Sequence, residues 1–139
     1  LIGSHVLAAP ILKQSKLHII STGYILVESG TQTTVSYISN TTPIPANKPE
    51  IAACTALAGE QLGLKIIYLE AGSGAQNAVS KEMIKAVKKQ ISIPLIVGGG
   101  IRTKAQLETA FLAGADVVVI GTAIENDIKF LEEIKTIKR

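Results

Sequence analysis

From residue 65 onward, short apolar runs of strand length alternate with amphipathic runs of helical spacing. This alternation is typical of a parallel sheet covered by helices, because parallel neighbours are joined by long crossover connections that are usually helical. The predicted strands lie at 65–69, 94–97 and 117–120, and the predicted helices at 80–90, 103–113 and 128–138. The pattern therefore predicts an α/β fold with parallel strands and covering helices.

The upstream third of the chain contributes a fourth strand. Its predicted elements are a helix end at 6–16, a strand region at 17–28, and an alanine-rich helix at 51–62 that stops at Gly63. Residues 31–50 between them are rich in Thr, Ser, Asn and Pro. We expect a long loop there, docked as a flap, with one short strand at 34–38.

Four βα units are too few for a closed barrel. An eight-stranded β/α barrel needs about 250 residues, whereas this chain has 139 and begins with a helix that no strand precedes. We therefore predict the C-terminal half of a TIM-type (β/α)8 barrel, as a single domain over residues 1–139 with the N-terminal half absent. Such a half-barrel leaves both sheet edges open and is expected to seek a partner.

Composition excludes several classes of protein. Apolar residues make up 47% of the chain, which excludes disorder, and the apolar runs are too short to span a membrane. The net charge of +3 comes largely from lysines spaced as on solvated helix faces, and aromatic residues are only 4%. Aromatic side chains do not interleave with this charge, so we expect no nucleic-acid partner.

Cysteine and histidine indicate neither a disulfide nor a metal centre. Cys54 is the only cysteine and is predicted to be a buried small apolar residue. His5 and His18 lack metal-ligand spacing, so no metal site is predicted in this chain. With no secretory leader recognisable at the N-terminus, we expect a cytoplasmic protein.

Glycine-rich turns follow three consecutive predicted strands. They are Gly72-Ser-Gly74, Gly98-Gly-Gly100 and Gly121-Thr122. In β/α barrels the catalytic and binding residues lie at the carboxyl ends of the strands, and phosphate commonly binds to the turns after the last two strands. The glycines could simply permit tight turns, but three such turns in succession favour a phosphate cradle made of backbone N–H groups.

Four side chains near these turns could carry chemistry, and each has a structural alternative. Glu70 could accept a proton from a substrate hydroxyl or pair with a basic residue at the rim; the adjacent cradle favours the first. Tyr68 could bond a polar substrate or fill the barrel interior. Tyr24 could line an apolar groove or pack in the core, and Arg102 could bind phosphate or form a structural ion pair.

Taken together, these motifs closely resemble the geranylgeranylglyceryl phosphate synthase family and its heptaprenylglyceryl relatives. The resemblance is carried by Tyr68-Leu-Glu-Ala-Gly-Ser-Gly-Ala75, Pro94-Leu-Ile-Val-Gly-Gly-Gly-Ile-Arg102, Gly114-Ala-Asp116 and Gly121-Thr-Ala-Ile-Glu125. It extends upstream to Thr22-Gly-Tyr24, Ser36-Tyr-Ile-Ser-Asn-Thr-Thr-Pro-Ile-Pro45 and Ala56-Leu-Ala-Gly-Glu60, and so covers essentially the whole chain.

This resemblance implies a Mg²⁺-assisted prenyltransferase that joins sn-glycerol 1-phosphate to a prenyl diphosphate through an ether bond. Glu70 would position or deprotonate the attacking hydroxyl. Tyr24 would sit beside the prenyl groove, with the 31–50 loop shaping the same side. The residues implied for glycerol 1-phosphate are Tyr68, Leu69, Glu70, Ala71, Gly72, Ser73, Gly74, Gly99, Gly100, Gly121 and Thr122.

The sequence departs from the family pattern in two ways. Ala78 stands where the family usually has proline, which affects entry into the next helix. The magnesium ligands and most diphosphate contacts are expected in the N-terminal half, so the isolated chain is expected to be inactive. We also expect a homo-oligomer that contacts the membrane peripherally for product release.

Two other functions stay open on the sequence. A barrel isomerase or lyase acting on a phosphosugar would use the same cradle, although the apolar side near Tyr24 and the lack of a second acid/base group argue against it. A non-catalytic, phosphate-binding half-barrel is the third reading, if the chain is complete as given.

Overall fold

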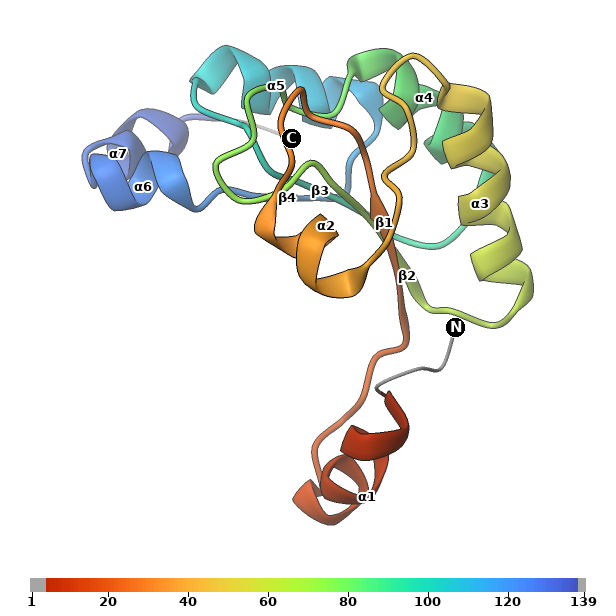
Figure 1. Ribbon diagram of the computed structural model, residues 1–139. Helices are drawn as coiled ribbons and strands as arrows, with labels where there is room; N and C mark the ends of the chain where they lie inside the picture. Colours follow the sequence, from red (N-terminus) through yellow and green to blue (C-terminus); the bar gives the residue numbers. More distant parts are fainter. Residues whose placement is uncertain (1–4, 138–139) are drawn as a thin grey trace.

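A computed structural model describes residues 5–137 (Figure 1). The elements in chain order are α1 (His5–Ser15), β1 (Thr22–Leu26), α2 (Thr34–Ser39), α3 (Pro49–Gln61), β2 (Ile66–Glu70), α4 (Lys81–Gln90), β3 (Leu95–Gly98), α5 (Lys104–Ala113), β4 (Val117–Val119), α6 (Thr122–Asn126) and α7 (Phe130–Ile134). The strands form one sheet in the order β1-β2-β3-β4, with every neighbouring pair parallel. The predicted α/β fold with parallel strands is therefore confirmed.

The strand register gives the sheet two different faces. Tyr24 lies beside Tyr68, Leu26 beside Glu70, and Glu70 beside Gly98. Because side chains alternate along a strand, these neighbours share one face. The alternate positions pack under α3, α4 and α5, and the fully buried ones are Ile67, Leu69, Leu95 and Val97. The core therefore lies on the helix side, and the polar residues project from the other.

Helix caps fix where the two central crossover helices begin. The Ser80 hydroxyl accepts a hydrogen bond from the backbone N–H of Met83 at 3.2 Å. Thr103 and Gln106 form a reciprocal capping box at the start of α5. Each cap satisfies backbone donors that the first helical turn leaves unpaired.

The predicted strand at 34–38 is wrong, because this segment is the helix α2. The backbone N–H of Ser36 donates to the Thr33 hydroxyl, and the Ser36 side chain reaches back to the backbone of Thr33. Asn40 ends the helix in the left-handed conformation, at φ 49°. Two local caps thus outweigh the strand preference of Val35 and Ile38.

The C-terminal part also differs from its prediction. The helix predicted over 128–138 is a shorter helix, α7, and the helix α6 precedes it without having been predicted. The two are separated at Asp127, whose carboxylate accepts a hydrogen bond from the backbone N–H of Lys129 at 2.9 Å. The last predicted position, Lys138, lies outside the described residues.

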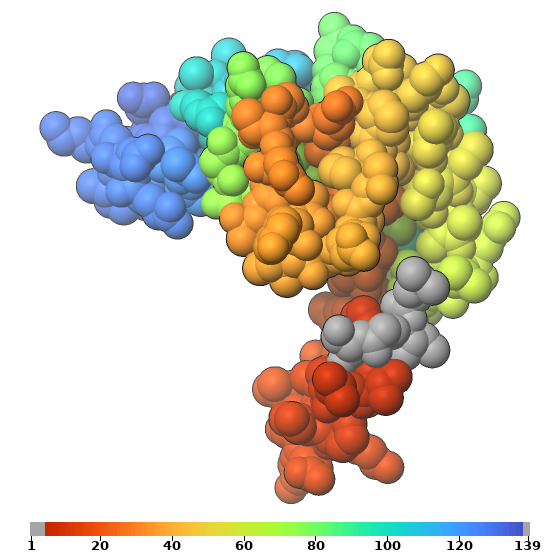
Figure 2. Space-filling view, in the orientation of Figure 1, coloured from red at the N-terminus to blue at the C-terminus, as the bar shows by residue number. Residues whose placement is uncertain are grey.

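The first helix stands away from the body of the molecule. Figure 2 shows α1 projecting below the sheet, and none of its residues is buried. The strand after it is shorter than predicted, because only the 22–26 part of the 17–28 region pairs with β2. Apolar side chains before the strand, such as Ile19 and Ile20, are exposed.

Cys54 is exposed on α3, so its predicted burial is wrong. Its small neighbours Ala52, Ala53 and Ala56 take the core-facing positions of that helix instead. None of the helices between residues 5 and 137 combines the length and apolar character that crossing a membrane requires.

Candidate functional site

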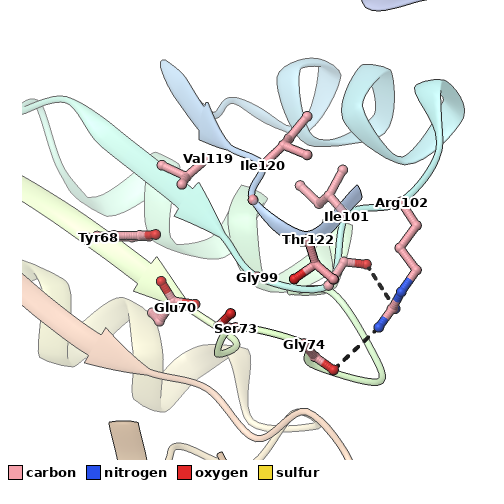
Figure 3. Close-up of a pocket in the computed structure, with 12 residues that line it drawn as sticks. Tyr68, Glu70, Ser73, Gly74, Gly99, Ile101, Arg102, Val119, Ile120 and Thr122 are labelled. Atoms are coloured by element: carbon pink, nitrogen blue, oxygen red, sulfur yellow. Dashed lines mark hydrogen bonds between the residues drawn. The ribbon is translucent and has the colours of Figure 1, made fainter. Parts of the chain in front are cut away.

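The three predicted glycine turns meet at one pocket on the carboxyl ends of β2, β3 and β4 (Figure 3). Its volume is about 130 Å³, below the roughly 300 Å³ at which sites for drug-sized ligands begin. It is lined by Tyr68, Glu70, Ser73, Gly74, Gly99, Gly100, Ile101, Arg102, Val119, Ile120, Gly121 and Thr122. A pocket of this size, edged by glycine turns, suits a small polar ligand such as a phosphate ester.

Glu70 is the last residue of β2 and is only 7% exposed. Its Oε1 atom accepts a hydrogen bond from the backbone N–H of Gly72 at 2.6 Å. None of the ion pairs within the described residues involves Glu70, so the predicted rim pairing with a basic side chain is not what holds it. A carboxylate tethered by the backbone keeps one orientation and retains acceptor capacity for a ligand.

Gly99 brings the turn after β3 against the turn after β2. A Cβ atom there would lie 2.7 Å from the backbone N and O of Gly72 and 2.8 Å from Glu70 Oε1. The residue also has φ +83°, which side chains disfavour. Any other residue would therefore push the turns apart, and the glycine is required by close approach as well as by turn geometry.

Two tyrosines from neighbouring strands flank Glu70. The rings of Tyr24 and Tyr68 meet edge to face, with centroids 5.0 Å apart. Tyr24 is about half exposed (51%), and its partial burial raises its pKa to about 12, with the negative charge of Glu70 and a hydrogen bond to it adding to the effect. The pKa of Tyr68 is also raised, first by burial and then by its hydrogen bond to Glu70. Both phenols therefore keep their protons at neutral pH and can donate to the carboxylate.

A second, larger pocket adjoins the first across Glu70. It has a volume of about 550 Å³ and is lined by Tyr24, Thr34, Val35, Ile38, Ser39, Glu70 and Ser73. The apolar side chains come from β1 and from α2, the helix that the sequence had predicted as a strand. Glu70 and Ser73 thus border both a small pocket edged by glycine turns and a larger one with an apolar wall.

Arg102 forms none of the ion pairs found within the described residues, so its predicted alternative as a structural ion-pair partner is wrong, whereas its predicted binding of phosphate stays a prediction. Its guanidinium donates hydrogen bonds to backbone carbonyl oxygens of two turns, the shortest being 2.6 Å to Ala75. These acceptors are neutral, so the contacts are not an ion pair. The side chain lines the small pocket while it bridges the loops that follow β2 and β3 (Figure 3).

The structure brings most of the predicted site residues together. Of the predicted residues, those that line the small pocket are Tyr68, Glu70, Ser73, Gly74, Gly99, Gly100, Gly121 and Thr122. Leu69 and Ala71 are buried on the core side and do not line it. The backbone N–H of Gly72 is occupied by Glu70. The role of each residue toward glycerol 1-phosphate stays a prediction.

Sequence reasoning missed the apolar part of the pocket wall. Ile101, Val119 and Ile120 line the pocket beside the glycine turns. Their signal was position, since each lies at or just after the carboxyl end of a predicted strand. Their apolar character is typical of strand and core residues, so it did not indicate a position in the pocket wall.

A metal site does not emerge from the described part of the chain. Between residues 5 and 137, no group of three or more His, Cys, Asp or Glu side chains is placed to hold a metal ion.

The chain is similar to curated proteins named geranylgeranylglyceryl phosphate synthase. Curated relatives from Spirosoma linguale and Thermococcus gammatolerans, both named geranylgeranylglyceryl phosphate synthase, are 56% and 50% identical to it. The alignments cover 100% and 88% of this chain but 56% and 48% of those relatives. The chain thus spans about half the length of the curated relatives it matches.

Solved structures give the same picture. The (S)-3-O-geranylgeranylglyceryl phosphate synthase of Thermoplasma acidophilum, solved with its substrate sn-glycerol-1-phosphate, superposes with a TM-score of 0.89 at 34% identity. The match covers 96% of this chain and 53% of that one. The corresponding enzyme of Thermoplasma volcanium gives 0.87 at 35%, over 99% of this chain and 57% of its own.

The predicted fold class, an α/β half of a TIM-type barrel, is confirmed by these neighbours. The domain boundaries 1–139 and the absence of the N-terminal half stay predictions. The predicted resemblance to the geranylgeranylglyceryl phosphate synthases is confirmed by the curated relatives. The profile of the PcrB family matches residues 1–139 from end to end. The chain belongs to the PcrB family.

Proposed function

We propose that the protein transfers a geranylgeranyl-type prenyl group from its diphosphate to the hydroxyl of sn-glycerol 1-phosphate, forming an ether-lipid precursor. The observation that carries this proposal is the position of Glu70 between two pockets of different character. A phosphate-sized pocket edged by glycine turns suits the acceptor, and a larger pocket with an apolar wall suits a prenyl chain. The names of the curated relatives support the same reaction.

Glu70 would act as the general base on the acceptor. As the glycerol hydroxyl oxygen attacks the first carbon of the prenyl chain, its proton passes to the Glu70 carboxylate. The new carbon–oxygen ether bond forms while the bond to the diphosphate oxygen breaks, and diphosphate leaves with the electron pair. The bond from Gly72 would keep the carboxylate aimed at the hydroxyl during this step.

The acceptor and the donor would be held by different elements. The turns containing Ser73, Gly99 and Gly121 would surround the phosphate of glycerol 1-phosphate. Val35 and Ile38 of α2, together with Tyr24, would pack against the prenyl chain. Apolar packing on one side and backbone polarity on the other would orient both substrates at Glu70.

The donor's charged end needs groups from beyond this segment. Diphosphate is normally neutralised by Mg²⁺ and basic residues, and residues 5–137 form no metal cluster. We therefore propose that the full-length protein requires Mg²⁺ held by residues outside this chain, and that the chain alone is inactive. A cytoplasmic homo-oligomer with peripheral membrane contact for product release is part of the same proposal.

The test is incorporation of radiolabelled sn-glycerol 1-phosphate into a prenylglyceryl phosphate by the full-length protein with geranylgeranyl diphosphate and Mg²⁺. We expect product from the 1-phosphate and at least about tenfold less from sn-glycerol 3-phosphate, since a site that hydrogen-bonds one enantiomer would leave polar groups unpaired with the other. The 139-residue chain, assayed in parallel, should give none.

A phosphosugar isomerase or lyase would behave differently in a binding assay. It would be protected against thermal unfolding by ribose-type phosphates and not by sn-glycerol 1-phosphate. That pattern, together with no ether product, would contradict the proposed transfer. If the full-length protein binds phosphate but transfers no prenyl group, the hypothesis of a non-catalytic phosphate-binding protein would be supported instead.

A further inference from the structure

We propose that Arg102 is a positioning residue of the phosphate pocket: its guanidinium holds the backbone of the loop after β2 in place, so that the glycine turns around the pocket keep their spacing. The identity of the ligand rests on the proposed function. The hold of the Arg102 guanidinium on the loop after β2, which we call the clamp, rests on hydrogen bonds between named atoms.

The guanidinium bridges two loops. Its Nη2 atom donates to the carbonyl oxygens of Ala75 at 2.6 Å and Gly74 at 3.4 Å. Its Nη1 atom donates to the carbonyls of Gln76 at 3.2 Å and Gly100 at 3.4 Å. One side chain from the turn after β3 therefore binds three consecutive carbonyls of the loop after β2, and one of its own turn.

The opposite side of the same loop is also bound. The backbone N–H of Ala75 donates to Gly72 at 3.1 Å, and that of Asn77 donates to Ser29 at 3.1 Å. A planar peptide directs its N–H and C=O groups to opposite sides. Where the N–H groups of a loop are bonded on one side, its carbonyl oxygens therefore point to the other side and need donors there. Arg102 supplies that second side.

The clamp starts from a fixed point. The backbone N–H of Arg102 donates to Gln106 Oε1 at 2.8 Å, within the capping arrangement of α5. Gly100, two residues earlier, lies so close to the loop that a Cβ atom there would be 2.9 Å from the backbone of Asn77 and Ala78. The two turns are in contact, and Arg102 spans them where they meet.

This arrangement argues against Arg102 as a direct phosphate ligand. A guanidinium has five N–H donors in a rigid fork, and both terminal nitrogens already serve two carbonyls each. Binding an anion head-on would release the loop. Arg102 can therefore add positive charge near the pocket, while its main effect is on loop geometry.

Lysine distinguishes the two roles. It keeps the positive charge but has a single ammonium that cannot span four carbonyls. A phosphate ligand should tolerate Arg102→Lys better than Arg102→Met, whereas a clamp should fail in both. Lys104 provides a matched control, because it lies two residues away and pairs with Glu108 and Thr136 outside the pocket.

The experiment measures amide hydrogen exchange in the ligand-free full-length protein and steady-state kinetics on the same samples. In Arg102→Lys and Arg102→Met we expect exchange over residues 72–78 to speed up about tenfold, while β2 and β3 stay protected. KM for sn-glycerol 1-phosphate should rise about tenfold in both variants with kcat within about threefold. Lys104→Met should change neither quantity.

The outcomes separate the proposals. If Arg102→Lys keeps wild-type exchange and KM while Arg102→Met loses substrate affinity, Arg102 is a charge contact and the clamp is wrong. Unchanged exchange in both variants would overturn the clamp even if the enzyme makes no ether product. Faster exchange in an inactive protein would support the clamp and contradict only the proposed function.

Discussion

The Glu70 carboxylate accepts a 2.6 Å hydrogen bond from the backbone N–H of Gly72, two residues further along the chain. This bond folds the turn after β2 back over the end of its own strand. It leaves the carboxylate buried but unpaired with any basic side chain among the ion pairs of the described residues. The geometry suits a base that must be held still while it receives a proton.

Substituting Gly99 with alanine should separate the turns that form the small pocket. The new Cβ would meet the backbone of Gly72 and the Glu70 carboxylate, at a residue with φ +83°. We expect a loss of about 2–4 kcal/mol in the free energy of unfolding and at least tenfold weaker binding of sn-glycerol 1-phosphate. Urea unfolding and calorimetric titration measure the two effects.

Gly63→Ala is the matched control. Gly63 has φ +87°, yet a Cβ atom there would meet nothing within 4 Å. Its substitution should cost about 1 kcal/mol from backbone strain alone and leave substrate binding intact. Equal effects of the two substitutions would mean that the close packing of the turns at Gly99 is unimportant.

Tyr24→Phe should change how stability depends on alkaline pH. The folded state raises the pKa of Tyr24 from about 10 to about 12, so it holds the phenolic proton more tightly than the unfolded chain does. The resulting stabilisation is complete below pH 10 and is lost as the pH rises toward 12. The fall in unfolding free energy between pH 9 and 12 should therefore be smaller in Tyr24→Phe than in the wild type.

A Tyr24→Phe slope identical to that of the wild type would show that Tyr24 keeps an ordinary pKa and does not interact with Glu70.

Asp116→Asn should lower stability without affecting the site. Asp116 Oδ2 accepts hydrogen bonds from Lys88 Nζ at 2.6 Å and from the backbone N–H of Leu95 at 2.7 Å. Leu95 is at the amino end of β3. In β/α barrels the amino ends of the strands contribute to stability, whereas the chemistry takes place at their carboxyl ends. We expect about 1 kcal/mol less unfolding free energy, because the pair is partly exposed.

Kinetics on the same variant check the separation of the two ends. KM for sn-glycerol 1-phosphate and kcat should both stay within about twofold of the wild-type values. A larger change in either would show that the amino end of the sheet is coupled to the pocket.

The main sheet and the small pocket could be predicted because their signals are local and repeated. Each of the strands β2, β3 and β4 is an apolar run that is followed by a glycine turn, so the carboxyl edge of this part of the sheet was predictable from chain order alone. The pocket then follows from placing three such turns on adjacent parallel strands.

The errors lie where short segments depend on capping or on tertiary packing. Residues 34–38 contain β-branched side chains, but the Thr33 and Ser36 caps make them helical. Cys54 has an apolar side chain, yet the alanines of α3 occupy the buried positions and leave it exposed. No periodicity reveals such outcomes, because they depend on which face of a short helix meets the sheet.

The role of Arg102 was also beyond sequence reasoning. An arginine after a triple glycine suggests a phosphate ligand, and nothing in the spacing shows that its acceptors are carbonyls of a loop some 26 to 28 residues away. The clamp depends on the path of the loop after β2, because its acceptors are backbone carbonyl oxygens that any residue type carries.

The most direct test of the account is the activity of Glu70→Gln in the full-length protein. Glutamine keeps the size of the side chain and an oxygen that can accept from Gly72, but it cannot take a proton from the glycerol hydroxyl. We predict that kcat for ether formation falls at least about 100-fold while the dissociation constant for sn-glycerol 1-phosphate changes less than about threefold. Full activity in Glu70→Gln would contradict the role of Glu70 as the base at the junction of the two pockets.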